Sequence, residues 1–302
     1  MNRLVEEYRG KIPSLADKPE ETMEATVRAL WSCAGGNPVS AERAMEIDLP
    51  VLSEGQDKAL EGLLKSRADG VPLAHLTGRQ RFMGLEFICN GQALIPRKET
   101  EILGNAARSL LTDDILPGNQ RPRVLDLCTG SGNLACAIAV LAPSCEVFAA
   151  DLSPEAIELA RENTRQLGCS DRVKIFAGDL FAPFECETFY GFFDLIVCNP
   201  PYVASAKVAV MHPELSGHEP KLAFDGGPFG VGVIWRVARD APRFLKRKGW
   251  LAFEVGLGQG LGLGERLSNN GVYAAARGVE DKRGNVRALV LKVSDEVGTE
   301  KC

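Results

Sequence analysis

The feature that most constrains the fold is the alternation of short apolar runs with helical stretches after Arg121-Pro122. This alternation is typical of a parallel β-sheet that helices cover on both faces. The last two runs are joined by a turn too short for a helical crossover, so we expect these two strands to be antiparallel. The sequence therefore predicts an α/β fold with a seven-stranded Rossmann-like sheet and an antiparallel last strand. The predicted strands span residues 123–128, 145–150, 172–177, 192–198, 249–255, 271–276 and 286–293.

The segment before this sheet is predicted to be helical. Apolar residues recur near helical spacing over residues 20–34, 41–47 and 56–69, with glycine and proline between these stretches. The run RFMGLEFICNGQALI (residues 81–95) alternates and contains Asn90-Gly91, a turn dipeptide, so it predicts a β-hairpin. We therefore expect a small helical N-terminal domain (1–78), a β-hairpin linker (79–98) and the sheet domain (99–302). Within the sheet domain a helix is predicted over 154–167, capped by Ser153.

Composition excludes several classes of protein. No apolar run is long enough for a membrane span, and the N-terminus lacks a signal-peptide core, so we expect a cytoplasmic protein. We also expect a monomer. The net charge of −5 disfavours a protein that binds nucleic acid by neutralising many phosphates. The nine cysteines contain no C-x-x-C pair, and no His or Cys spacing suggests a metal site.

The first predicted strand runs into a glycine-rich turn. In VLDLCTGSGNLA (residues 124–135), Gly130 and Gly132 let the backbone turn tightly, and the helix that follows offers unpaired N–H groups to a ligand. The G-x-G-x-x-A pattern also fits nicotinamide and flavin sites, and a tight turn without a ligand is a further alternative. The turn therefore predicts a polar cofactor without identifying it.

Acidic residues follow the next two strands. Asp151 comes 19 positions after Gly132, where a carboxylate accepts hydrogen bonds from ribose hydroxyls, although an acid at a helix N-terminus is the simpler interpretation. The third strand ends in the sequence Gly178-Asp179-Leu180-Phe181. Because the carboxyl ends of parallel strands meet at one edge, these segments together outline a nucleoside site.

The fourth strand ends in Asn199-Pro200-Pro201-Tyr202. The prolines fix their φ angles and remove two N–H donors, which leaves a rigid turn whose carbonyl oxygens are free to accept. The Asn199 side-chain oxygen and the Pro200 carbonyl can each accept one N–H of a planar –NH2 group and stabilise the positive charge that methylation builds on its nitrogen. Tyr202 offers a flat face to such a group. A Pro-Pro strand terminator with a chance asparagine is the simpler alternative.

Together, VLDLCTGSG, Asp151, GDLF and NPPY resemble class I S-adenosylmethionine-dependent methyltransferases that act on amino nitrogen. PLAHLTGRQRFMGLEF (72–87), LIPRKETE (94–101), HEPKLAFDGG (218–227) and EDKRGNVRAL (280–289) narrow the resemblance to the release-factor glutamine methyltransferase (HemK-type) family. The resemblance covers roughly residues 45 to 293. It implies S-adenosylmethionine as cofactor and methylation of the glutamine of a Gly-Gly-Gln loop in peptide-chain release factors. It also implies a helical N-terminal domain, a hairpin linker and a seven-stranded sheet.

The resemblance also implies roles for individual residues. Thr129 to Gly132 would hold the methionine part of the cofactor, Asp151 the ribose and Leu180 the adenine surroundings, and Arg97, supported by Glu101, would lie near the active-site mouth. The expected catalytic residues are Asn199, Pro200 and Tyr202, and the expected substrate-binding residues are Asn199, Pro200, Pro201, Tyr202 and Arg97. The expected cofactor-binding residues are Asp126, Thr129, Gly130, Ser131, Gly132, Asp151, Leu152, Asp179, Leu180 and Asn199.

Two positions and one stretch depart from the family pattern and leave other substrates open. Lys98 stands where proline is common, Cys128 replaces a common glycine, and GGPFGVGVIWR (226–236) lacks an acidic residue often found there. The alternatives are an N-methyltransferase of a nucleic-acid base or of a small-molecule amine or amide, both of which suit NPPY, and a noncatalytic scaffold that binds release factor or cofactor. A nicotinamide dehydrogenase has less support because no acid or base for hydride chemistry accompanies the glycine turn.

Overall fold

The computed structural model describes residues 1–13, 18–211 and 213–294, which form two compact units. The first unit contains the described residues of 1–98 and 211–220, and the second contains residues 99–210 and those from 221 onward. The chain thus leaves the second unit after Val210 and returns to it at Lys221, a grouping that the sequence patterns do not indicate. The domain boundaries given above stay a prediction.

The second unit is built on a large β-sheet. Seven strands of the described residues form it in the order β5-β4-β3-β6-β7-β9-β8. The strands from β5 to β7 pair in parallel, whereas β9 is antiparallel to both β7 and β8. The predicted fold class is therefore confirmed. The strands are β3 (Arg123–Leu127), β4 (Glu146–Asp151), β5 (Val173–Ala177), β6 (Phe193–Cys198), β7 (Leu245–Glu254), β8 (Tyr273–Glu280) and β9 (Val286–Val293).

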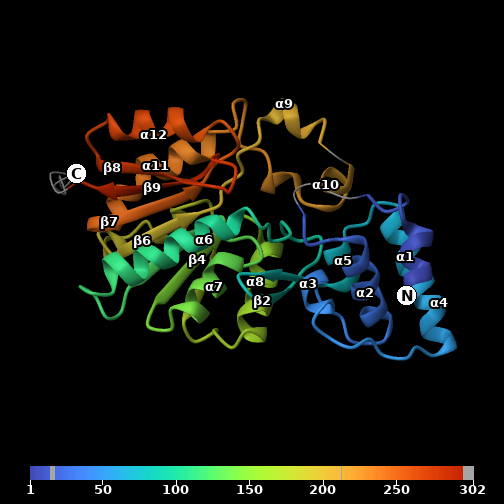
Figure 1. Cartoon of the computed structure of the whole chain (residues 1–302). Coiled ribbons are helices and arrows are strands. Elements are labelled where there is room, and N and C mark those ends of the chain that lie inside the picture. The colour runs from blue at the N-terminus through green and yellow to red at the C-terminus, as the bar shows by residue number, and fades with distance from the viewer. Residues whose placement is uncertain (14–17, 212, 295–302) are drawn as a thin grey trace. The chain divides into compact units, whose positions relative to one another are not determined.

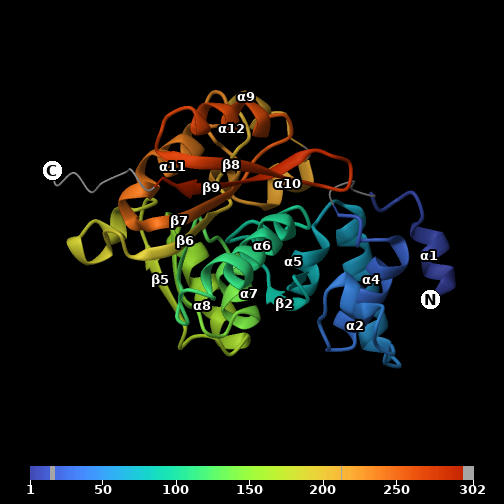
Figure 2. The same ribbon diagram turned by 60° about the vertical axis from the view of Figure 1, so that its left-hand side comes forward.

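Helices cover both faces of this sheet, as Figures 1 and 2 show. On one face lie α6 (Thr100–Ser109), α7 (Asn133–Leu141) and α8 (Pro154–Gln166), and on the other lie α11 (Gly232–Phe244) and α12 (Gly260–Ser268). α6 continues into a π-helical turn, and it has no counterpart among the predicted helices. The short elements are this π-helical turn (Leu110–Ile115), the 3-10 turns Ala182–Phe184, Glu187–Phe189 and Lys221–Ala223, and the helix α9 (Ser205–Val208).

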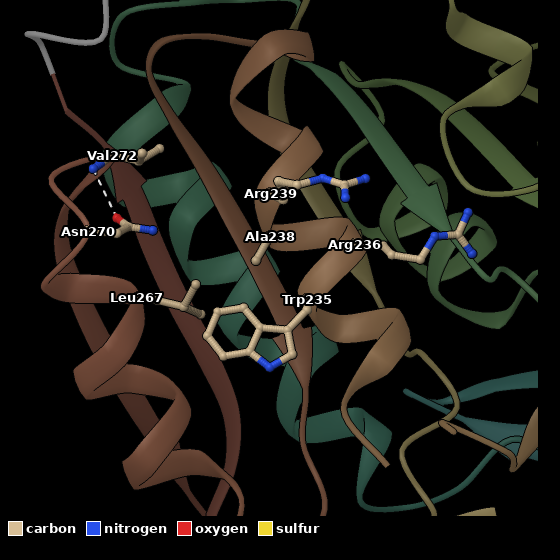
Figure 3. Close-up of a pocket in the computed structure, with 7 residues that line it drawn as sticks. All are labelled: Trp235, Arg236, Ala238, Arg239, Leu267, Asn270 and Val272. Atoms are coloured by element: carbon tan, nitrogen blue, oxygen red, sulfur yellow. Dashed lines mark hydrogen bonds between the residues drawn. The ribbon is translucent and has the colours of Figure 1, made fainter. Parts of the chain in front are cut away.

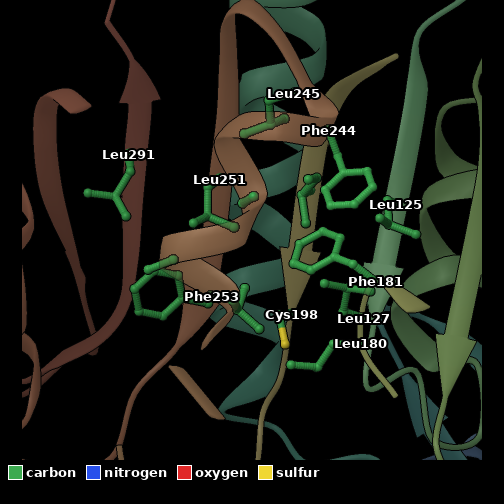
Figure 4. Close-up of a cluster of buried hydrophobic side chains, with 14 of the residues drawn as sticks. Leu125, Leu127, Leu180, Phe181, Cys198, Phe244, Leu245, Leu251, Phe253 and Leu291 are labelled. Carbon is green, nitrogen blue, oxygen red and sulfur yellow. The ribbon is translucent and has the colours of Figure 1, made fainter. Parts of the chain in front are cut away.

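Apolar side chains of the sheet and its helices form the core of the second unit, part of which Figure 4 shows. Every residue of β6 is buried, as expected for a central parallel strand with helices on both faces. Phe181 and Phe244 stack in this core with ring centroids 4.5 Å apart. This packing holds the central strands, so their carboxyl ends form a rigid base for the candidate site.

Local signals in the sequence explain α8. The Ser153 hydroxyl accepts a hydrogen bond from the backbone N–H of Ala156 at 3.1 Å, and Pro154 occupies the first helical position. The helix predicted over 154–167 with Ser153 as its cap is therefore confirmed.

We expect Ser153→Ala to lower the free energy of unfolding by about 1 kcal/mol, because it removes an N-cap acceptor. The shift of the urea midpoint, followed by circular dichroism, measures this change. Ser268→Ala is the control, because its exposed hydroxyl bonds a backbone carbonyl at a helix end and its loss should change stability by less than about 0.5 kcal/mol. Equal midpoint shifts for the two variants would contradict the capping role.

The first unit is mainly helical and has its own apolar core. Its two strands form a hairpin, so the predicted hairpin exists, but the predicted turn at Asn90-Gly91 is wrong. The turn lies at Met83-Gly84, where both residues have positive φ, the geometry of a tight two-residue hairpin loop. The elements are α1 (Asn2–Tyr8), α2 (Met23–Ala34), α3 (Ala41–Ala44), α4 (Glu54–Ala68), α5 (Leu73–Thr77), β1 (Arg79–Phe82), β2 (Leu85–Ile88) and α10 (Pro213–His218).

Buried ion pairs explain why residues 211–220 belong to the first unit. The Glu214 carboxylate lies 2.9 Å from both Lys18 Nζ and Arg67 Nη1, and all three side chains are almost inaccessible to solvent. Glu219 pairs with Arg97 and accepts the backbone N–H of Ile95 at 2.8 Å. Removal of one partner of such a pair leaves an uncompensated buried charge, so these contacts fix the segment within the unit.

Candidate functional site

The glycine turn between β3 and α7 forms the first part of the candidate site. Gly130 has φ of 54°, and a β-carbon there would meet nothing within 4 Å, so its α-carbon faces open space. Gly132 has φ of 79°, and its β-carbon would lie 3.1 Å from that of Ala160 in α8. Gly132 therefore lets α7 and α8 approach closely, while Gly130 leaves room beside the turn. Cys128 has φ of 56°, an uncommon value for a residue other than glycine.

Asp126 is a fully buried carboxyl below this turn. Its Oδ2 accepts hydrogen bonds from the Thr129 hydroxyl at 2.6 Å and from the Ala135 N–H at 3.1 Å. Its Oδ1, like the Ser131 hydroxyl, is buried without a hydrogen-bond partner among the described residues. Burial raises the pKa of Asp126 to about 7, although its two hydrogen bonds oppose this shift. An unpaired buried acceptor beside a glycine turn suits the cationic amino group of an amino-acid cofactor.

The raised pKa of Asp126 makes a prediction for stability. Between its unfolded value of about 4 and its folded value, the folded state binds more protons, so its contribution to the free energy of unfolding falls as pH rises. Asp126→Asn keeps the shape and removes the titration. We therefore expect the stability of the variant relative to the unsubstituted protein to rise with pH up to about 7 and then level off. Urea unfolding across this range measures the difference, and a flat or falling difference would contradict the account.

Asp151 ties the end of β4 to the glycine turn. Its Oδ2 accepts the Gly130 N–H at 2.8 Å, and its Oδ1 accepts the Ser153 N–H at 2.9 Å. Burial raises the pKa of Asp151, and these backbone hydrogen bonds oppose the shift. The carboxylate thus accepts a hydrogen bond at the start of α8, which agrees with the simpler interpretation given above. It also fixes the glycine turn through Gly130. The next residue, Leu152, is 52% exposed.

The segment after β5 lies at the neighbouring strand end. The Gly178 N–H bonds the Asp151 carbonyl at 2.8 Å, which joins this segment to the end of β4. Leu180 is buried with φ of 49° and belongs to the core of the unit. Asp179 instead forms a half-exposed ion pair with Arg236 of α11. The structure thus brings Asp126, Thr129 and Asp151 together through the Gly130 turn, while the Asp179 side chain is engaged with α11.

The Asn199 side chain lies at the end of β6. Leu127 of β3 pairs with Cys198 of β6. Asn199 and the start of the glycine turn therefore follow paired residues of neighbouring strands. The Asn199 side-chain nitrogen donates to the Thr100 hydroxyl, with Nδ2 and Oγ1 3.1 Å apart. Within the part of the chain that the structure describes, no donor bonds the Asn199 Oδ1 atom. An amide held through its nitrogen alone offers its oxygen as an acceptor.

The rest of the NPPY segment is held in place through its backbone carbonyl groups. Gln259 donates through Nε2 to the Tyr202 carbonyl at 3.0 Å and to the Gly230 carbonyl at 3.3 Å. A β-carbon at Gly226 would lie 2.6 Å from the Pro201 carbonyl oxygen, and one at Gly230 would lie 2.3 Å from that of Tyr202. Gly226 and Gly230 are therefore needed because the NPPY backbone passes directly against them.

Tyr202 is held by its hydroxyl. The hydroxyl donates to Glu254 Oε1 at 2.9 Å, and Glu254 is a buried carboxyl at the last position of β7. Burial raises the pKa of Tyr202 above its ordinary value, and the negative charge of Glu254 adds to this effect. Tyr202 therefore stays protonated near neutral pH and acts as a donor.

Sequence reasoning missed Thr100, Glu254 and Gln259. Glu254 had a usable signal, because it is an acid at the carboxyl end of a strand, the same pattern that indicated Asp151. Thr100 and Gln259 lie far from Asn199 and Tyr202 in the sequence, so only the folded chain brings them together. Arg97 belongs to the first unit, where its partner is Glu219, and its predicted substrate role stays a prediction.

Two pockets of the described residues lie away from the predicted site residues, and the larger, of about 720 Å³, lies between α6 and β8. Figure 3 shows a pocket of about 350 Å³ between α11 and α12, lined by Trp235 and Leu267 among others, that includes none of the predicted site residues. No described helix has the length and apolarity to cross a bilayer. Nor do the described residues contain a group of three or more His, Cys, Asp or Glu side chains suited to a metal ion.

Comparison with known sequences places the chain among methyltransferases. Residues 103–255 match the methyltransferase small domain family. A release factor glutamine methyltransferase of Geobacter sulfurreducens is 37% identical, over 67% of this chain and 66% of that protein. Proteins with the same name from Gloeobacter violaceus and Moorella thermoacetica are 35% and 32% identical, and their matches cover 80% and 91% of this chain and 82% and 92% of theirs.

Comparison with solved structures agrees on the fold. The human methyltransferase 10 domain containing protein has a TM-score of 0.52 at 18% identity, over 78% of this chain and 97% of that one. The N-terminal domain of human METTL16 in complex with SAH has a TM-score of 0.51 at 17% identity, over 78% of this chain and 83% of that one. At such identities the likeness concerns the fold alone.

Proposed function

Because the chain belongs to the release factor glutamine methyltransferase family, we propose that it methylates the side-chain amide nitrogen of a glutamine in a peptide-chain release factor. The glutamine is that of the Gly-Gly-Gln loop. The observation that carries this proposal is the open Asn199 Oδ1, an amide acceptor fixed through its nitrogen at the end of a buried strand.

The methyl donor is S-adenosylmethionine, which supplies an electrophilic methyl group when bound. The residues at the glycine turn fit this cofactor, since Asp126 Oδ1 is an unpaired buried acceptor and Gly130 faces open space. Thr129, Gly130, Ser131 and Gly132 would hold its methionine part together with Asp126. Asp151 and Leu152 would hold its ribose, and Asp179 and Leu180 would lie around its adenine.

Asn199 and Pro200 orient the nitrogen that is methylated. An amide nitrogen is a poor nucleophile because its lone pair is delocalised, and methylation places positive charge on it. Asn199 Oδ1 and the Pro200 carbonyl each accept one N–H of the glutamine, which directs the lone pair at the methyl carbon and stabilises the developing charge. The hydrogen bond from Gln259 and the glycines at 226 and 230 hold this corner rigid, so its acceptors need little reorganisation during the reaction.

Tyr202 packs beside the substrate amide and does not remove its proton. Its raised pKa keeps the hydroxyl protonated, and that hydrogen is used in the bond to Glu254. The nitrogen becomes acidic once it carries the new charge, so its proton passes to water without a strong base. The flat ring of Tyr202 is then a packing surface for the planar amide.

The experiment that tests this function is methyl transfer from labelled S-adenosylmethionine to three substrates. These are purified release factor, release factor with the loop glutamine changed to alanine, and a mixture of tRNA and DNA. We expect label in the first alone. Label in nucleic acid alone would overturn the proposal, and label in the glutamine-free release factor would show that another residue is the target.

A further inference from the structure

Three exposed apolar side chains lie in the loops next to the NPPY segment, and the proposed chemistry uses none of them. Phe229 is 84% exposed, Leu257 is 66% exposed and Leu261 is 75% exposed. We call these three residues the apolar patch. Single exposed apolar residues are ordinary in a soluble protein, whereas several that gather at one place mark an interaction surface.

The side chain of Gln259 connects the two loops that carry the apolar patch. Gln259 lies between two of the patch residues in the sequence, and its Nε2 atom lies 3.3 Å from the carbonyl oxygen of Gly230, the residue after Phe229. The same Nε2 atom donates to the Tyr202 carbonyl oxygen at 3.0 Å. The residues of the patch are therefore neighbours in sequence of groups that contact the NPPY backbone.

The order of the strands places one loop of the apolar patch on the side of Asn199 that is away from the cofactor. The glycine turn follows β3, Asn199 follows β6, and the loop that contains Leu257 follows β7. These three parallel strands are neighbours in that order. A cofactor held at the glycine turn would lie on one side of Asn199, so the loop on the other side is left to the molecule that carries the target amide.

The absence of charge around the apolar patch indicates what kind of partner suits it. The three segments that meet here, residues 195–206, 226–235 and 255–264, contain no Asp, Glu, Lys or Arg, although these residues make up 25% of the whole chain. A nucleic acid is held mainly by cations that contact its phosphates. An uncharged surface with exposed apolar side chains instead suits an apolar surface of a protein.

We propose that the apolar patch is a docking surface for the release factor and contacts an uncharged, apolar face of it beside the Gly-Gly-Gln loop. This inference rests on the proposed function, because it names the surface that holds the protein whose glutamine reaches Asn199. The Gly-Gly-Gln sequence carries no charge, which matches the uncharged segments around Asn199. Burial of the patch supplies affinity for the partner without a contact to the reacting nitrogen, so its loss affects binding and not the chemical step.

The first test compares Phe229→Ser with Leu141→Ser. Phe229→Ser removes the most exposed side chain of the patch. Leu141→Ser is the matched control, because Leu141 is an exposed apolar residue at the last position of α7, the helix that leads away from the glycine turn. Calorimetric titration of each protein, loaded with S-adenosylhomocysteine, measures the Kd of purified release factor. We expect Phe229→Ser to raise this Kd by about ten-fold, as when an interface loses an aromatic side chain, and Leu141→Ser to leave it unchanged.

The second test uses steady-state kinetics to separate docking from an effect on the NPPY segment. With release factor as substrate, we expect KM to rise by about ten-fold in Phe229→Ser and by about three-fold in Leu257→Ser. The kcat at saturating release factor and the Kd of S-adenosylmethionine should stay the same in both variants. A lower kcat with an unchanged KM would contradict docking, because it would show that the patch acts on the reacting groups.

The two tests distinguish failure of this inference from failure of the proposed function. If release factor binds through the patch but receives no label, the proposed function fails and the docking surface stands. If Phe229→Ser binds release factor as tightly as the unsubstituted protein does, the docking surface is refuted even when label is transferred. Absence of release-factor binding to the unsubstituted protein would overturn the inference as well, and so would a patch variant that weakens the binding of tRNA alone.

Discussion

We expect Asn199→Ala to lower kcat for release factor methylation by about 10²-fold or more, because in the proposed function Asn199 Oδ1 is one of the acceptors that stabilise charge on the reacting nitrogen. The Kd of S-adenosylmethionine should change much less, since the proposed function places the Asn199 side chain against the substrate amide. Steady-state kinetics with release factor, together with calorimetric titration of the cofactor, measures the two effects separately.

The control for this variant is Asn105→Ala, which removes an exposed asparagine from α6 and should leave both quantities unchanged. A parallel loss of kcat and of cofactor affinity in Asn199→Ala would contradict the account, because it would make Asn199 a cofactor-binding residue instead.

Gly230→Ala is expected to lower kcat to a similar extent, by about 10²-fold, because displacement of an acceptor by about 1 Å has effects of this size. The new β-carbon would lie 2.3 Å from the Tyr202 carbonyl oxygen, so the NPPY backbone must move. It would also lie 3.1 Å from Gln259 Nε2, which donates a hydrogen bond to that carbonyl oxygen.

Gly227→Ala is the matched control for Gly230→Ala. Gly227 also has positive φ, 88°, but a β-carbon there would meet nothing within 4 Å. It therefore introduces the backbone strain of a left-handed alanine, about 1 kcal/mol, without the clash. Thermal unfolding should show the larger loss of stability in Gly230→Ala, which adds the clash to the backbone strain, and kcat should fall strongly in Gly230→Ala alone. Equal losses of kcat would show that the contact with Tyr202 does not position the site.

Much of the second unit could be predicted because its signals are local. Apolar runs define the strands of a parallel sheet, and Ser153 with Pro154 marks the start of α8. The prediction of the hairpin turn was wrong. Asn90-Gly91 is a good turn dipeptide, but the hairpin turns at Met83-Gly84. There the register of β1 and β2 brings Phe82 and Phe87 into edge-to-face contact, with ring centroids 6.1 Å apart. This cross-strand contact within the hairpin favours the turn at Met83-Gly84.

The supports of the candidate site could not be predicted, because they connect distant parts of the chain. Thr100 and Asn199 are 99 positions apart, and Tyr202 and Glu254 are 52 apart. No local pattern indicates such pairs. The inclusion of residues 211–220 in the first unit is of the same kind, because it depends on Lys18 and Arg67 meeting Glu214 in a buried ion cluster.

The most direct test of the central claim is a crystal structure of the protein with S-adenosylhomocysteine and a peptide that contains the Gly-Gly-Gln loop. We expect the glutamine side-chain nitrogen within about 2.7–3.2 Å of both Asn199 Oδ1 and the Pro200 carbonyl oxygen. A complex in which the glutamine is bound elsewhere, or in which Asn199 Oδ1 bonds the protein itself, would contradict the claim that this corner holds the amide for methylation.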